Sequence, residues 1–96
     1  MNITVNDIES CLIYTRDNCR FCVLAKELLK ENKINFNEIK LNDINTKYQL
    51  YNILSKKFTR EIKTLPQIII NSNVLVGGYT ELYHLLQKKD TQECSK

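Results

Sequence analysis

The sequence predicts one α/β domain in which a four-stranded mixed sheet has helices on both faces, in the order β-α-β-α-β-β-α. Short apolar runs typical of strands alternate with segments of helical periodicity. The last two strand candidates, residues 67–70 and 74–76, are separated only by a turn at 71–73, so an antiparallel hairpin is expected. Earlier in the chain, a strand, a helix and a second strand favour parallel pairing through a right-handed crossover. The 96 residues suffice for one small core.

The first half of the chain predicts a strand, a helix and a second strand. Residues 11–14 are an apolar run typical of a buried strand. Residues 22–31 are expected to be helical because apolar side chains recur there at helical spacing, namely Val23, Leu24, Leu28 and Leu29. Residues 34–41 contain a nearly alternating pattern and predict the second strand.

The second half predicts two further helices around the hairpin. Asn45 or Thr46 can cap the first of them, and Thr46 with Gln49 forms a capping box. The apolar face of this helix is expected to consist of Leu50, Ile53, Leu54 and Phe58. Thr80 can cap the last helix, whose apolar residues are Leu82, Leu85 and Leu86.

The composition is that of an ordinary globular protein, with 43% hydrophobic and 26% charged residues. A net charge of +3 is too small to predict nucleic-acid binding. No apolar run approaches the roughly 20 residues that span a bilayer, so no membrane partner is expected. Residues 1–9 lack the features of a secretory signal and form an arm or short helix, which favours a cytoplasmic location. The folded domain is expected to span 10–90, followed by a polar tail at 91–96.

Two cysteines separated by two residues, Cys19 and Cys22, follow the first strand and open the first helix. A cysteine at the start of a helix meets unpaired backbone N–H groups and the positive end of the helix dipole, which stabilise its thiolate. A second cysteine one turn later can close a disulfide with it, so the pair indicates thiol–disulfide exchange rather than a structural staple. Cys11 is expected to fill core volume and Cys94 to lie in the polar tail, and a zinc site is disfavoured because there is only one such pair.

Two further motifs accompany this pair: Thr64-Leu65-Pro66 before the third strand, and Gly77-Gly78-Tyr79-Thr80-Glu81-Leu82 after the fourth. With these three motifs in this order, the chain resembles dithiol glutaredoxins of the thioredoxin fold from about residue 11 to residue 86. The resemblance implies a glutathione-dependent thiol–disulfide oxidoreductase that reduces protein disulfides and glutathione mixed disulfides. It implies Cys19 as nucleophile, Cys22 as resolving thiol, and glutathione as reducing co-substrate, regenerated by glutathione reductase. A monomer is expected.

The resemblance also implies which residues bind glutathione. They are Arg16, Phe21, Lys63, Leu65, Pro66, Gly78, Thr80 and Glu81. In such a site, a cis bond before the proline turns the backbone of the preceding residue toward the thiols, where an extended peptide can pair with it. The basic residues suit one glutathione carboxylate, and the glycine pair with the following helix start suits the γ-glutamyl end. Tyr79 either shapes the pocket wall or packs into the core, and His84 is expected at the surface.

Arg20 is the main departure from the family pattern, because many glutaredoxins have proline after the first cysteine. Some glutaredoxins without this proline bridge a [2Fe–2S] cluster between two subunits with glutathione as co-ligand. The alternative function is therefore a cluster scaffold or carrier, a glutathione-ligated dimer in which Cys19 is the metal ligand. Apart from this alternative, no metal site is expected. A reductase of the thioredoxin type is not favoured, since the chain has no tryptophan.

Overall fold

The computed structural model describes the backbone of residues 8–94 and the side chains of residues 8–86. The elements follow the predicted order. They are β1 (Cys11–Thr15), α1 (Arg20–Glu31), β2 (Asn37–Lys40), α2 (Ile44–Phe58), β3 (Gln67–Ile70), β4 (Val74–Gly77) and α3 (Tyr79–Cys94). The expected N-terminal arm at residues 1–9 lies almost entirely outside the described residues.

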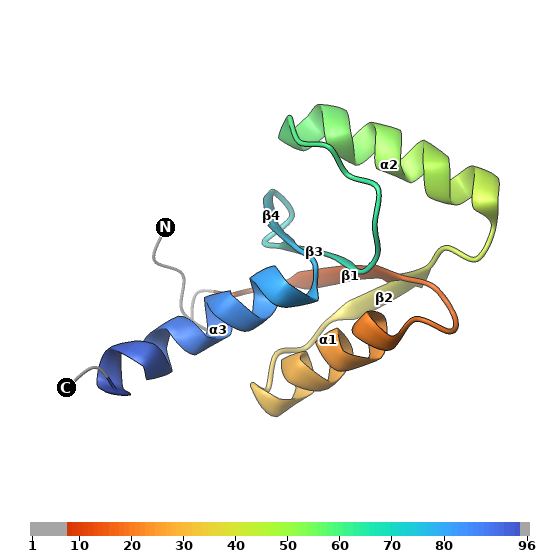
Figure 1. Ribbon diagram of the computed structural model, residues 1–96. Helices are drawn as coiled ribbons and strands as arrows, with labels where there is room; N and C mark the ends of the chain where they lie inside the picture. The colour runs from red at the N-terminus through yellow and green to blue at the C-terminus, as the bar shows by residue number, and fades with distance from the viewer. Residues whose placement is uncertain (1–7, 95–96) are drawn as a thin grey trace.

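The four strands form one mixed sheet in the order β2-β1-β3-β4. β1 runs parallel to β2 and antiparallel to β3, and β3 and β4 form the expected antiparallel hairpin. Figure 1 shows α1 and α3 on one face of the sheet and α2 on the other. The predicted fold class is confirmed. Because β1 is a central strand, the residues that follow it lie near the middle of the sheet, at the end where β1 finishes.

Two clusters of buried side chains hold these layers together. The larger cluster lies between the sheet and the α1/α3 layer and consists of Cys11, Ile13, Ala25, Leu29, Ile34, Ile68, Ile70 and Leu82. The smaller cluster includes α2 residues and consists of Tyr51, Leu54, Ile62 and Ile69. Ile68 and Ile69 face opposite clusters because side chains alternate along a strand, which explains why the three residues after Gln67 in β3 are all apolar.

The start and the buried face of α2 differ from the prediction. Asp43 is the N-cap, since its carboxylate accepts a hydrogen bond from the Thr46 backbone N–H at 2.9 Å and another from the Thr46 hydroxyl. Neither Asn45 nor Thr46 is the cap, because the carboxylate of Asp43, the residue directly before the helix, takes that role. Ile53 is 60% exposed, whereas Tyr51 is buried. The apolar stripe was therefore wrong at Ile53, because the helix meets the sheet along a slightly rotated face.

Two further boundaries differ. β2 covers only Asn37–Lys40, because its pairing with β1 begins at Asn37, and all four of its residues are exposed at the sheet edge. Thr80 lies inside the first turn of α3 rather than at its cap, and Gly78 accepts the hydrogen bond from the Leu82 N–H. α3 continues to Cys94, so the backbone of residues 91–94 is helical, and the end of the folded domain at residue 90 stays a prediction. No described helix is long and apolar enough to cross a membrane.

Candidate active site at the start of α1

The two cysteines of the motif lie at the first turn of α1 and are joined in a disulfide, with their Cα atoms 5.2 Å apart. Cys19 is the N-cap, and its Sγ accepts a hydrogen bond from the Cys22 N–H at 3.1 Å. After reduction, the same N–H and the helix dipole would stabilise a negative charge on this sulfur. Both cysteines are buried, Cys22 at 1% exposed and Cys19 at 6%, so Cys19 is the slightly more accessible residue of the two.

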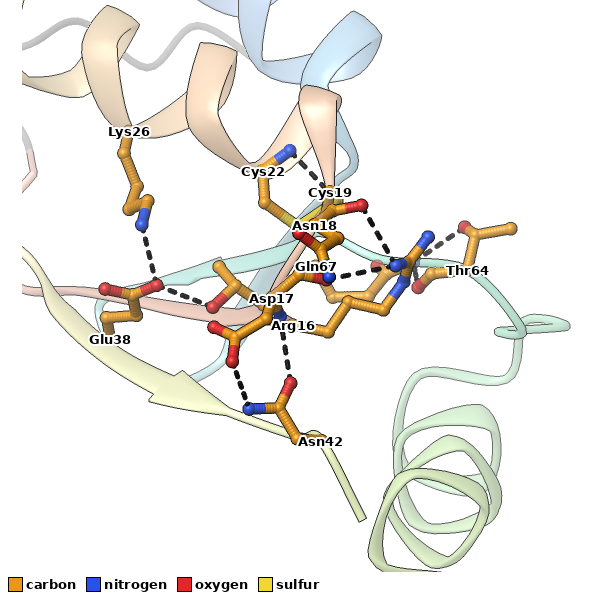
Figure 2. The surroundings of a disulfide bond; sticks show 11 residues. Arg16, Asp17, Asn18, Cys19, Cys22, Lys26, Glu38, Asn42, Thr64 and Gln67 are labelled. Atoms are coloured by element: carbon orange, nitrogen blue, oxygen red, sulfur yellow. Dashed lines mark hydrogen bonds and ion pairs between the residues drawn. A yellow bond between two sulfur atoms is a disulfide. The ribbon is translucent and has the colours of Figure 1, made fainter. Parts of the chain in front are cut away.

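The turn before Cys19 is built from three exposed residues. The Arg16 guanidinium donates from Nη1 to the backbone carbonyls of Asp17 and Asn18, each at 3.2 Å. Asn18 has a left-handed backbone with φ of 58°, a conformation that asparagine tolerates better than most residues. Figure 2 shows that Asp17 points to Asn42, away from the disulfide. Arg16, predicted to bind a glutathione carboxylate, therefore also supports the turn that precedes Cys19.

A pocket of about 280 Å³ lies between the first turn of α1, the segment before β3 and the start of α3. Its lining residues are Phe21, Thr64, Leu65, Pro66, Gly78, Tyr79, Thr80 and Glu81. Six of the eight residues predicted to bind glutathione are therefore in this one pocket. The bond between Leu65 and Pro66 is cis, as expected. Tyr79 takes both of the positions considered for it, because it lines the pocket and also packs against the larger core cluster.

The other two predicted residues do not line the pocket. Arg16 bonds the turn, as described above. Lys63 pairs with Glu61 at 3.3 Å, and the side chains are 71% and 79% exposed. Such an exposed ion pair contributes little, so Lys63 can exchange this partner for a ligand carboxylate at small cost.

Glu81 organises the start of α3. Its Oε1 accepts a hydrogen bond from the Gly78 N–H at 2.9 Å. Gly77 has a φ of 115°, and a Cβ there would meet the Glu81 side chain at 3.1 Å. The Gly78 N–H expected to meet a ligand carboxylate is thus already paired within the chain. An anionic ligand group at this turn would use other N–H groups of the first turn, while Glu81 offers an acceptor for a ligand ammonium.

Two residues at the site were absent from the predicted set. Thr64 lines the pocket, and its backbone carbonyl accepts a hydrogen bond at 3.0 Å from Nε2 of Gln67. Gln67 is 6% exposed, so its amide supports the segment before β3 from beneath. The signal for Thr64 was its place in the Thr-Leu-Pro motif, whereas a polar residue at the start of an apolar strand was the only sign of Gln67.

A polar network lies behind the dithiol at the end of β1. Thr15 is fully buried, and its hydroxyl donates to Glu38 Oε2 at 2.6 Å. Lys26 of α1 pairs with the same oxygen at 2.9 Å. The hydrogen bond from Thr15, followed by that from Lys26, lowers the pKa of the Glu38 carboxyl. Thr15 ends the strand from which the active-site turn begins, so this network ties that point to both β2 and α1 (Figure 2).

The remaining cysteine with a described side chain is Cys11. It is a free thiol in the larger core cluster, and burial raises its pKa to about 11, so it belongs to the core as expected. Cys94 and its expected role lie outside the described side chains. Among the side chains that the structure describes, no three or more His, Cys, Asp or Glu residues come together as metal ligands. The cluster alternative requires Cys19 from two chains and stays a prediction.

The fold and the paired cysteines at the first turn of α1 define a thiol–disulfide oxidoreductase with the thioredoxin fold. The glutaredoxin family model matches residues 11–75. Glutaredoxin 1 of Rickettsia felis is 33% identical over 78 residues, which cover 81% of this chain and 72% of that protein. The chain belongs to the glutaredoxin family.

Solved structures agree with this assignment. The crystal structure of glutaredoxin 1 from Francisella tularensis, complexed with cacodylate, has 34% sequence identity and a TM-score of 0.73. That match covers 88% of this chain and 96% of the other. The crystal structure of a buckwheat glutaredoxin–glutathione complex has a TM-score of 0.68 at 17% identity, covering 92% of this chain and 74% of that one, and shows the common fold.

Proposed function

We propose that this protein uses glutathione to reduce protein disulfides and glutathione mixed disulfides through Cys19 and Cys22. The observation that carries this proposal is the pocket that joins Phe21, the segment at Leu65 and Pro66, and the start of α3. An extended backbone at Leu65 can pair with a short peptide, and Glu81 can accept from an ammonium group. A buckwheat glutaredoxin of the same fold was solved with glutathione, which supports this choice of ligand.

In the proposed reaction, the Cys19 thiolate attacks the glutathione sulfur of a mixed disulfide. A Cys19–glutathione disulfide forms, and the substrate leaves as a thiolate that takes up a proton. A second glutathione then attacks this intermediate and releases glutathione disulfide and reduced Cys19. With a protein disulfide, Cys22 instead attacks the Cys19–protein disulfide, which releases the substrate and leaves the Cys19–Cys22 disulfide for two glutathione molecules to reduce.

The stabilised thiolate contributes mainly to the release step. For a thiol at pH 7, lowering the pKa from about 8.5 to about 5 raises the thiolate fraction about 30-fold. Over the same range, its intrinsic nucleophilicity falls about 40-fold for a Brønsted slope near 0.45. These two effects nearly cancel for attack by Cys19. The gain is that Cys19 becomes a better leaving group when glutathione attacks its mixed disulfide, while the pocket supplies orientation.

The testing experiment is reduction of a glutathionylated peptide coupled to glutathione reductase and NADPH oxidation. Cys19→Ser should abolish turnover, and retained activity would contradict the assignment of the nucleophile. Cys22→Ser should keep deglutathionylation while losing reduction of a protein disulfide. Equal loss of both activities would exclude the two-role scheme. Cys11→Ala is the matched control, since this buried thiol lies in the core and not at the site.

The proposal includes the protein's partners and setting. Its substrates are disulfide-bearing or glutathionylated proteins, glutathione reductase regenerates the glutathione, and the protein works as a cytoplasmic monomer. Size-exclusion chromatography with light scattering, in the presence of glutathione, tests the monomer. A dimer that appears only after reconstitution with iron, sulfide and glutathione, together with visible absorption of a [2Fe–2S] cluster, would instead support the scaffold alternative.

A further inference from the structure

The turn before Cys19 is held by a side chain from a distant part of the chain. Asn42, in the connection between β2 and α2, accepts a hydrogen bond from the Asp17 N–H at 2.8 Å. Its amide Nδ2 donates to the Asp17 carboxylate at 2.9 Å. The two bonds close a reciprocal pair between segments 25 residues apart, which Figure 2 shows below the disulfide.

This pair is the main side-chain anchor between the turn and the end of β2. Lys40 also pairs with the Asp17 carboxylate at 3.2 Å, but both side chains are more than half exposed, at 53% and 56%. The Asn42 bonds are exposed as well, but they restrain the backbone N–H and the carboxylate together, whereas a lone exposed ion pair contributes little. Asn18 follows in a left-handed conformation that needs such support, and Cys19 comes next.

We propose that Asn42 is a positioning residue for disulfide exchange at Cys19. It holds the turn that sets the orientation of the Cys19 backbone, and it keeps the Asp17 carboxylate turned away from the sulfur. Asn42 lines no part of the pocket, so it acts through Asp17 and not by contact with substrate.

The charge of Asp17 gives this role a redox consequence. A released carboxylate two residues before the helix N-cap is attracted to the same helix N-terminus that stabilises the Cys19 thiolate. A second negative charge there disfavours the thiolate and therefore the reduced dithiol. Loss of Asn42 should shift the equilibrium toward the Cys19–Cys22 disulfide, which makes the protein harder to reduce.

The test measures this equilibrium against dithiothreitol, so it does not depend on the proposed use of glutathione. The protein disulfide is reduced to two thiols while dithiothreitol is oxidised to its cyclic disulfide. Asn42→Ala should shift the equilibrium about threefold to tenfold toward the protein disulfide, and tenfold corresponds to about 30 mV for this two-electron couple. The double variant Asp17→Asn with Asn42→Ala should return to the wild-type equilibrium, because the freed side chain is then neutral.

A kinetic measurement, which rests on the proposed function, separates the restraint of the turn from the effect of the Asp17 charge. In the glutathione-coupled assay, Asn42→Ala and the double variant should both lower kcat while leaving the KM for glutathione unchanged, because the turn is loosened in both. Asn32→Ala is the matched control, since Asn32 bonds the Leu28 carbonyl at the other end of α1 and should change neither readout. A wild-type dithiothreitol equilibrium in Asn42→Ala, or an equal shift in the double variant, would overturn the proposal.

Discussion

Thr15 shows how one buried polar residue at the end of a strand can support a site without touching a substrate. Its hydroxyl is fully buried and has a charged acceptor, Glu38, on the neighbouring strand. Burying a hydroxyl without a partner is costly, whereas a hydrogen bond to a carboxylate is among the stronger kinds. The short bond therefore makes a polar residue acceptable at a position where β1 otherwise faces the core.

Thr15→Val tests this bond, because valine keeps the shape and removes the hydroxyl. We expect a loss of about 1 kcal/mol in the free energy of unfolding at pH 7, reduced by solvent access to Glu38. The bond lowers the pKa of Glu38, so its stabilisation is present above the ordinary glutamate pKa of 4.5 and is lost as the pH falls through the lowered value. Urea denaturation between pH 7 and pH 3 should show the two proteins converging.

Glu38→Gln is the control for that pH dependence. Glutamine can still accept from Thr15 but does not titrate, so the acid-range fall attributed to Glu38 should be missing from its stability curve. A difference between Thr15→Val and wild type that stays constant down to pH 3 would show that the charge on Glu38 has no part in the effect.

At the scale of the element, two adjacent glycines connect β4 to α3, and only the first of them has a backbone conformation that favours glycine. Gly77 ends the strand with a positive φ and packs against the side chain of Glu81. Gly78 has no such φ, and a Cβ there would find its nearest atoms at an ordinary 3.4 Å. The close approach at Gly77 lets Glu81 reach back to the Gly78 N–H and begin the helix.

Gly77→Ala should therefore lower the free energy of unfolding by about 1–3 kcal/mol, because the new methyl group meets both backbone strain and the base of the Glu81 side chain. Gly78→Ala is the matched comparison and should stay within about 1 kcal/mol of wild type. Chemical denaturation of both variants measures the difference. Equal losses would mean that the positive φ does not distinguish these positions.

At the scale of the whole molecule, the central strand couples the site to the larger core. β1 pairs with neighbours on both sides, its first residue Cys11 is buried, and its last residue leads into the active-site turn. An element bonded on two sides and packed on both faces opens only when most of the domain unfolds. Cys11 is therefore a natural reporter of global unfolding.

In the reduced protein carrying Cys94→Ser, iodoacetamide at pH 8 should alkylate Cys19 rapidly and leave Cys11 unmodified. Burial raises the pKa of Cys11 to about 11, so both access and thiolate formation oppose its reaction in the native state. Peptide mass spectrometry across a urea titration should show Cys11 labelling follow the global transition. Labelling of Cys11 well before that transition would indicate local opening of β1.

Much of the fold was predictable because its signals are local. The apolar run of β3, the helical spacing in α1 and the short hairpin turn each depend on neighbouring residues, and each prediction was confirmed. The errors lie where the decisive contact comes from elsewhere. Ile53 belongs to an apolar stripe in sequence, yet the position of α2 against the sheet leaves it exposed and buries Tyr51. Likewise, β2 is shorter than its pattern because pairing with β1 defines its first residue.

The sequence by itself determined the dithiol at a helix start, the order of elements and the family, since these depend on residue type and spacing along the chain. Only the tertiary structure decided which predicted residues share one pocket, that Arg16 supports the turn before Cys19, and that Asn42 is hydrogen-bonded to Asp17. Those contacts join segments that are distant in the chain or depend on side-chain direction. A one-dimensional pattern does not specify them, because they form only when the strands and helices pack together.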